Sequence, residues 1–168
     1  MKCDSYQRLG AMCFGESLGT FLLVLFGTAT VAVAVLFQAP VGLLQIAAVW
    51  GAGVTLAIYA TRHLSCAHLN PAVSLGMVIA GRMRIGLLPW YWISQLLGAV
   101  VAGMTVLLLF HGAITDYESA HQIIRGAPES IQTAMIFGEY FPNPGFAASG
   151  LGVTPGTAML AEALGTFL

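Results

Sequence analysis

Three long apolar stretches run along the chain, separated by segments that carry most of its polar residues. Residues 12–37 are apolar apart from Glu16 and small hydroxyl residues, and residues 43–61 and 88–110 carry no charge. Each stretch has 19 or more residues, and about 20 residues of α-helix are needed to cross a hydrocarbon core of about 30 Å. The pattern therefore predicts three transmembrane helices and an all-α membrane protein.

The composition agrees with a membrane location. Apolar residues make up 58% of the 168 residues and charged residues only 8%, whereas a soluble domain has about 25% charged residues. So few charges could not cover the surface of a soluble fold, and we expect the lipid bilayer to surround most of the chain. The net charge of −1 leaves no basic surface for nucleic acid.

The basic residues predict how the chain is oriented. With the N-terminus in the cytoplasm, segment 62–84 lies inside, whereas loop 38–42 and the long outer loop 111–155 lie outside. The basic residues inside are then Lys2, Arg8, Arg62, Arg82 and Arg84, and the one outside is Arg125. Because cytoplasmic loops carry the excess of Lys and Arg, we expect a multi-pass protein of the plasma (inner) membrane with a cytoplasmic N-terminus.

Segment 64–80 is long enough to cross the membrane, but its flanks argue against a crossing. If it crossed, Arg62 and Arg82 would lie on opposite sides and the next span would run in the wrong direction. An extended chain over residues 64–69 reaches about 20 Å, and a helix over residues 70–80 is about 16 Å long. Each length is close to half a bilayer, so we predict a re-entrant segment that enters from the cytoplasm and returns to it.

The middle of this segment suggests a pore. Asn70 is a good N-cap and Pro71 a good first helical residue, although the pair alone could be an ordinary helix start. Non-helical backbone deep in a membrane is tolerated only inside protein or beside a water-filled cavity. Loop carbonyls and the positive end of a half-helix would then bind neutral hydroxyls or water and repel cations and protons. The carbonyls expected to line the cavity are those of Cys66, Ala67, His68 and Leu69.

A short motif occurs twice. The residues from Glu16 to Leu22 recur from Glu162 to Leu168, with six of seven positions identical. Three spans separate the copies, so the second copy would enter the membrane from the opposite face, as in the inverted repeats of transporters. We expect residues 1–156 to form a first repeat and residues 157–168 to begin a second, inverted repeat that is cut short.

Small residues spaced four apart predict contacts between helices. Such pairs occur at Gly15 and Gly19 and at Ala99 and Gly103. Small side chains let helix backbones approach closely in lipid. We therefore expect helices to pack along these faces.

Taken together, these residues resemble the major intrinsic protein family, the aquaporins and glycerol facilitators. Residues 65–73 are similar to its first Asn-Pro-Ala loop, and the two Glu-x-x-Gly-Thr motifs match the starts of its first and fourth spans. Trp50 occupies a position where water-selective members usually have Phe, and residues 121–126 and 140–144 resemble the outer loop of glycerol facilitators. The chain departs from the family at Cys66, usually Gly, and at Phe141, which resembles an insertion.

The resemblance implies a passive transmembrane channel for glycerol and other small neutral solutes, with water. The pore would be completed by a second repeat, and the whole protein would form a homotetramer. The implied site residues are Asn70, Pro71 and Ala72 in the pore, Trp50 in the selectivity filter, Leu23, Val54 and Val73 in an apolar wall, and Glu16 and Glu162 as acceptors for loop N–H groups.

Several alternatives remain open at this point. The channel could select water, or the chain could be a non-conducting, truncated membrane protein that only packs with partners. Trp50 could be an aromatic residue at the membrane interface. We expect no enzyme, because the spans carry no nucleophile with a base. We also expect no cofactor and no metal, because Cys66 and His68 provide too few ligands for a metal site.

Overall fold

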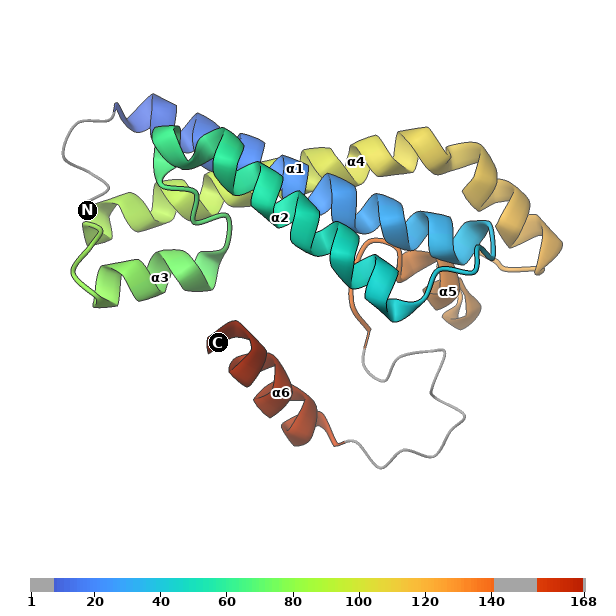
Figure 1. Cartoon of the computed structure of the whole chain (residues 1–168). Helices are drawn as coiled ribbons and strands as arrows, with labels where there is room; N and C mark the ends of the chain where they lie inside the picture. The colour runs from blue at the N-terminus through green and yellow to red at the C-terminus, as the bar shows by residue number, and fades with distance from the viewer. Residues whose placement is uncertain (1–7, 141–153, 168) are drawn as a thin grey trace. The chain divides into compact units, whose positions relative to one another are not determined.

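The computed structural model describes residues 8–140 and 154–167, and these form helices and turns without a β-strand. This confirms the predicted all-α fold. The elements are α1 (Leu9–Leu36), α2 (Leu43–Ser65), α3 (Pro71–Ile79), α4 (Leu88–Ala120), α5 (Ile131–Ala134) and α6 (Pro155–Phe167), with short 3-10 turns at Ile85–Leu87 and Pro128–Ser130 (Figure 1). The chain divides into two compact units, residues 1–112 and 113–168, which are described separately below.

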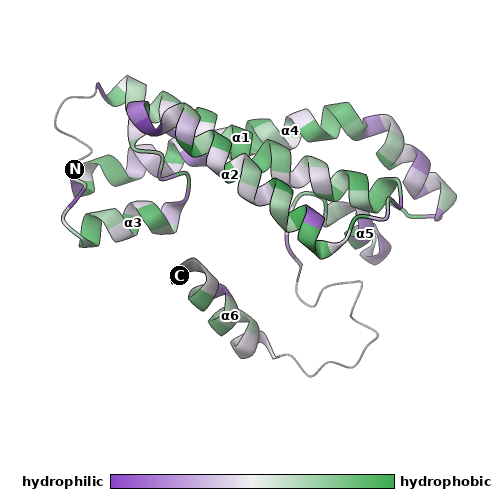
Figure 2. Cartoon of the chain, viewed as in Figure 1, coloured by the Kyte–Doolittle hydropathy of each residue, from purple (hydrophilic) through white to green (hydrophobic). Residues whose placement is uncertain are grey.

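Among the residues that the structure describes, three helices are long and apolar enough to cross a membrane. They are α1, α2 and the segment Ile85–Ala120 that contains α4, and Figure 2 shows apolar residues along most of their length. The helix α4 runs on to Ala120, past the predicted boundary at residue 110, so the first part of the predicted outer loop is helical. The apolar run ends near residue 110, but the helix continues because residues 111–120 contain no Pro that would interrupt it.

In the first unit, α1 and α2 pack side by side through glycines on α1 (Figure 1). A Cβ added to Gly15 would come within 2.8 Å of the Cβ of Leu64, and one added to Gly19 would fall on Leu69. Further along α1, the six-membered ring of Trp50 lies directly over Gly27. The predicted packing face at Gly15 and Gly19 is therefore a contact with the end of α2 and the loop after it.

The close contact between α1 and α4 lies at Gly98. A Cβ added to Gly98 would meet the backbone carbonyl of Ser17, whereas one added to Gly103 would have no atom within 4 Å. Within the described residues no helix packs on Gly103, and the packing face expected at Ala99 and Gly103 stays a prediction. Small residues are frequent along this helix, so their spacing alone does not say which of them touches a neighbour.

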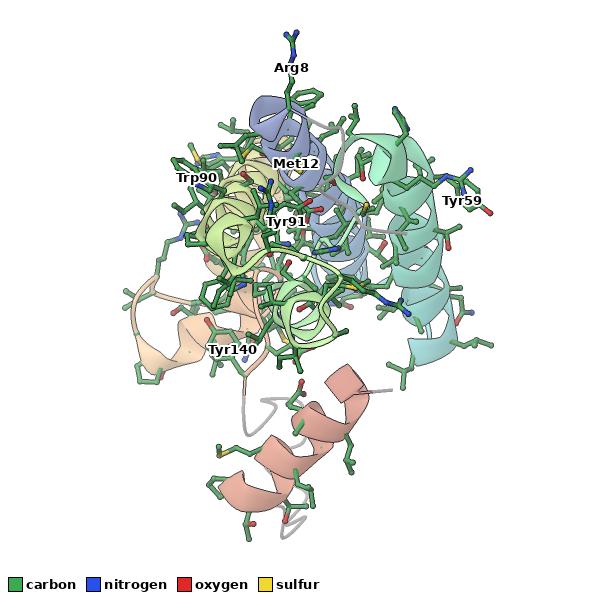
Figure 3. The ribbon with its side chains drawn as sticks, turned by 90° about the vertical axis from the view of Figure 1, so that its left-hand side faces the viewer. Arg8, Met12, Tyr59, Trp90, Tyr91 and Tyr140 are labelled. Carbon is green, nitrogen blue, oxygen red and sulfur yellow. The ribbon has the colours of Figure 1, made fainter. Side chains whose placement is uncertain are left out.

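A small apolar core joins the starts of α1 and α4 to the end of α3. Its buried residues are Met12, Met83, Leu87, Leu88 and Tyr91, with Met77 and Val78 packed against them. Figure 3 shows Tyr91 pointing in among the helices and Trp90, its neighbour in the chain, pointing away from them. This core holds α3 beside the first turns of α4.

The second unit contains the end of α4, α5 and α6. The buried Glu118 carboxylate accepts hydrogen bonds from Thr133 Oγ1 at 2.9 Å and Arg125 at 2.7 Å. The hydrogen bond to Glu118 also raises the pKa of Arg125. The Glu118 carboxylate thus holds Arg125 and Thr133, in the segment after α4, against that helix.

Candidate functional site

The loop between α2 and α3 has an unusual backbone. Cys66, Ala67 and Leu69 have φ angles of 66°, 51° and 53°, in the left-handed region that residues with a Cβ rarely adopt. Cys66 lies at the left-handed C-cap of α2, which is the position that glycine favours. Such a backbone persists only where its surroundings hold it, so the contacts of this loop determine its shape.

Glu16 on α1 provides the central contact. Its side chain is fully buried. Its Oε1 accepts a hydrogen bond from the backbone N–H of His68 at 2.9 Å, and its Oε2 accepts one from the backbone N–H of Leu69 at 2.8 Å. A third donor, Gln95 Nε2 on α4, lies 2.7 Å from Oε2. A carboxylate in an apolar region is costly unless it is partnered, and three donors supply that partnership.

Gln95 extends this network to the half-helix. Its Nε2 also lies 3.0 Å from the Oγ of Ser74 on α3, and the Nδ1 of His68 lies 3.2 Å from the same oxygen. Ser74 is fully buried and its hydroxyl reaches the carbonyl of Asn70 at 3.2 Å. Side chains from α1, α3 and α4 therefore meet around the loop.

Sequence reasoning missed Gln95. The available signal was a polar side chain inside the uncharged stretch 88–110. A polar residue in a membrane helix usually faces the protein interior, so Gln95 could have been identified as a partner of another buried polar group.

Two neighbouring aromatic residues of α4 hold the two ends of the loop. The Tyr91 hydroxyl donates to the carbonyl of Ser65 at 2.7 Å, and the Tyr91 ring lies 4.9 Å from that of His68. Trp92 Nε1 donates to the carbonyl of Pro71 at 3.1 Å. The loop is thus fixed where it leaves α2 and where it enters α3.

The start of α3 presents its polar groups outward. Asn70 has an extended backbone, and its Oδ1 accepts a hydrogen bond from the N–H of Ala72 at 2.8 Å. Residues 70–73 are exposed within the chain. The helix has nine residues and is about 14 Å long, close to half of a hydrocarbon core.

The other predicted site residues lie on several elements. Trp50, Leu23 and Val54 are half-buried on α2 and α1, and Val73 is exposed on α3. In the loop, Cys66 and Ala67 are half-buried, whereas His68 and Leu69 are buried. Glu162 is exposed on α6 in the second unit, and its role as an acceptor for the loop of the second repeat stays a prediction.

The site combines polar and apolar groups. In the part of the chain that the structure describes, no three His, Cys, Asp or Glu side chains come together as metal ligands. The exposed groups are an amide, helix N–H groups and apolar side chains. Such groups can hydrogen-bond a neutral solute and contact its alkyl surface.

Comparison with known proteins agrees with this geometry. Among solved structures, the chain is similar to the aquaglyceroporin from Plasmodium falciparum, with a TM-score of 0.59 and 34% identity over 65% of this chain and 45% of that one. It is 43% identical to the glycerol uptake facilitator protein of Haemophilus influenzae over 148 residues, which are 86% of this chain and 54% of that protein. It is 39% identical to the propanediol uptake facilitator PduF of Citrobacter freundii over 80% of this chain and 50% of that protein.

The chain spans about half the length of the curated relatives it matches. The family model described as Major intrinsic protein matches residues 3–168. This match covers nearly the whole chain and confirms the resemblance seen in the sequence. The chain belongs to the major intrinsic protein family.

Proposed function

We propose that this chain forms one wall of a passive transmembrane pore for glycerol and other small neutral solutes, with water. The observation that carries the proposal is the exposed start of α3, which the buried Glu16 network holds in place. Relatives at 39–43% identity are named as uptake facilitators for glycerol and propanediol, both small polyols. The proposal requires no energy source and no catalytic group.

Asn70 is the polar contact for the solute in this proposal. Its Oδ1 is occupied by the N–H of Ala72, so the two amide N–H groups are the donors that remain for a solute oxygen. The N-terminus of α3 adds partial positive charge, which repels cations. Carbonyls of residues 66–69 would act as acceptors for the solute hydroxyls.

The alkyl side of the solute needs an apolar surface. We assign that role to Trp50, as the filter residue, and to Leu23, Val54 and Val73. The Trp50 ring rests on Gly27 of α1, which fixes one face of the indole against the helix. A fixed indole favours a polyol over water because only the polyol has carbon atoms to place against it.

The rest of the pore would come from a second repeat. Residues 1–156 would form the first repeat, and residues from 157 onward would begin an inverted one, in which Glu162 supports the second loop. The chain covers 54% and 49% of the length of two glycerol uptake facilitators, which supports the proposal of a second repeat. The complete protein would lie in the plasma (inner) membrane with a cytoplasmic N-terminus and assemble as a homotetramer.

The test is solute flux into liposomes that contain a two-repeat protein, in which the first repeat of this chain is followed by a second repeat. We expect light scattering to show glycerol entry well above that of empty liposomes. Asn70→Leu, which removes the amide, should lower glycerol permeability about 10-fold or more. Gln132→Leu is the matched control, because it removes an exposed amide outside the site. Glycerol entry no faster than in empty liposomes, with correctly inserted protein, would refute the proposal, and a change in water permeability alone would favour a water channel.

A further inference from the structure

Trp92 contacts the half-helix α3, and the proposed function gives this contact no role. The side chain is 42% exposed, yet its indole N–H reaches across from α4 to the carbonyl of Pro71 at 3.1 Å. Pro71 is the first residue of α3 and directly follows Asn70. The hydrogen bond therefore holds the end of α3 next to Asn70, the residue proposed to contact the solute.

A helix of nine residues needs such contacts. Short helices are marginal on their own, and tertiary contacts supply most of their stability. On its buried side, α3 is held through Ser74, which lies 3.0 Å from Gln95 Nε2. Met77 and Val78, near the end of α3, pack on the small apolar core. The hydrogen bond at Pro71 adds a contact at the opposite end of the helix and fixes the position of its first turn.

Both contacts come from one rigid element. Trp92 and Gln95 lie three positions apart on α4, so their side chains project from neighbouring parts of the same face. Two donors at a fixed spacing on one helix hold two acceptors at a fixed spacing on another. Trp92 therefore fixes the position of Asn70 relative to α4, and Glu16 fixes it relative to α1.

We propose that Trp92 is a positioning residue, whose indole N–H sets where Asn70 stands in the pore and thereby the balance between glycerol and water passage. The inference rests on the proposed function of the same site. Glycerol must make several contacts at once, whereas water makes fewer. A displaced Asn70 therefore costs glycerol more than it costs water.

The first experiment removes the N–H group without removing the ring. In the same two-repeat protein, Trp92 is replaced by 3-benzothienylalanine, which keeps the fused rings and has sulfur in place of the N–H. The matched control is the same replacement at Trp90, which is 50% exposed and points away from the helices (Figure 3). Glycerol and water permeabilities of liposomes are measured for each protein, together with the thermal midpoint.

We expect the glycerol-to-water permeability ratio to fall about fivefold at position 92 and to stay unchanged at position 90. Fivefold corresponds to about 1 kcal/mol, the usual net worth of one hydrogen bond. Trp92→Phe should give the same fall, because it also lacks the donor. An unchanged ratio at position 92, or an equal change at both positions, would overturn the inference.

A second measurement separates this inference from the proposed function. In protein labelled with ¹⁵N in its indole groups, the Trp92 signal is identified by its loss in Trp92→Phe. We expect its N–H to exchange with solvent at least 10-fold more slowly than that of Trp90. Fast exchange at both positions would overturn the inference even if glycerol passes. Slow exchange at Trp92 in a protein that carries no glycerol would instead refute the proposed function.

Discussion

Glu16 and Leu69 are 53 positions apart in the sequence, yet the carboxylate of the first lies 2.8 Å from the backbone N–H of the second. The neighbouring N–H of His68 donates to the other carboxylate oxygen. A buried carboxylate with two backbone donors holds a loop whose residues have left-handed backbone angles. The start of α3 is exposed in a defined place because this contact exists.

Replacing Glu16 tests that relationship. In Glu16→Gln one carboxylate oxygen becomes an NH₂ donor facing donors, so at least one backbone N–H loses its acceptor. We expect a loss of about 2–3 kcal/mol in unfolding free energy, seen as a lower thermal midpoint in detergent. Glu129→Gln, at an exposed position of the second unit, is the control and should change little. Equal midpoints for the two variants would mean that Glu16 does not hold the loop.

Glycine substitutions test the contact between α1 and α4. Gly98→Ala places a Cβ against the backbone carbonyl of Ser17, and backbone cannot move aside as a flexible side chain can. We expect a loss of about 2–3 kcal/mol from overpacking. Gly103→Ala is the matched variant on the same helix, with open space around it, and should be neutral or gain about 0.5–1 kcal/mol. Thermal unfolding of both variants decides the matter, and a harmless Gly98→Ala would contradict the close approach.

Trp50 should influence which solute passes. If its indole forms the apolar side of the filter, Trp50→Ala loses contacts with the carbon atoms of glycerol and widens the passage. We expect the glycerol-to-water permeability ratio of the two-repeat protein to change about 10-fold. Trp90→Ala controls for the loss of an aromatic residue elsewhere. An unaltered ratio, with normal expression, would leave Trp50 as a packing residue on Gly27 alone.

Thiol labelling tests the predicted orientation of the chain in the membrane. Single cysteines at positions 62 and 84, placed in an otherwise cysteine-free protein, should react with a membrane-impermeant thiol reagent only from the cytoplasmic side. Position 122, in the predicted outer loop, should react only from outside. Reaction of position 84 from outside would mean that segment 64–80 crosses the membrane rather than returning.

The sequence was sufficient for the long helices and for the half-helix. Apolar runs locate α1, α2 and α4, and Asn70 and Pro71 locate the start of α3. The return of segment 64–80 to the cytoplasm stays a prediction. The prediction was wrong about where α4 ends, because hydropathy marks where lipid contact stops and not where helical hydrogen bonds stop.

The contacts around the loop could not be predicted in the same way. Glu16 stood out as a charge in an apolar run and Gln95 as a polar side chain in an uncharged one, but Tyr91 and Trp92 look like ordinary residues of a membrane helix. Their roles depend on the rotation of α4 relative to α3, which is a property of packing in three dimensions. The same is true of Gly98, which contacts α1 although a neighbouring small-residue pair had the expected spacing.

Glycerol flux through two matched proteins tests the central claim most directly. One is residues 1–168 alone, and the other is residues 1–156 continued by the second half of the Haemophilus influenzae glycerol uptake facilitator protein. Both are placed in liposomes at equal amounts and tested by stopped-flow light scattering. We predict rapid glycerol entry with the two-repeat protein and entry close to that of empty liposomes with residues 1–168. Rapid entry with residues 1–168 alone, or no entry with a correctly inserted two-repeat protein, would contradict the account of this chain as one wall of a glycerol pore.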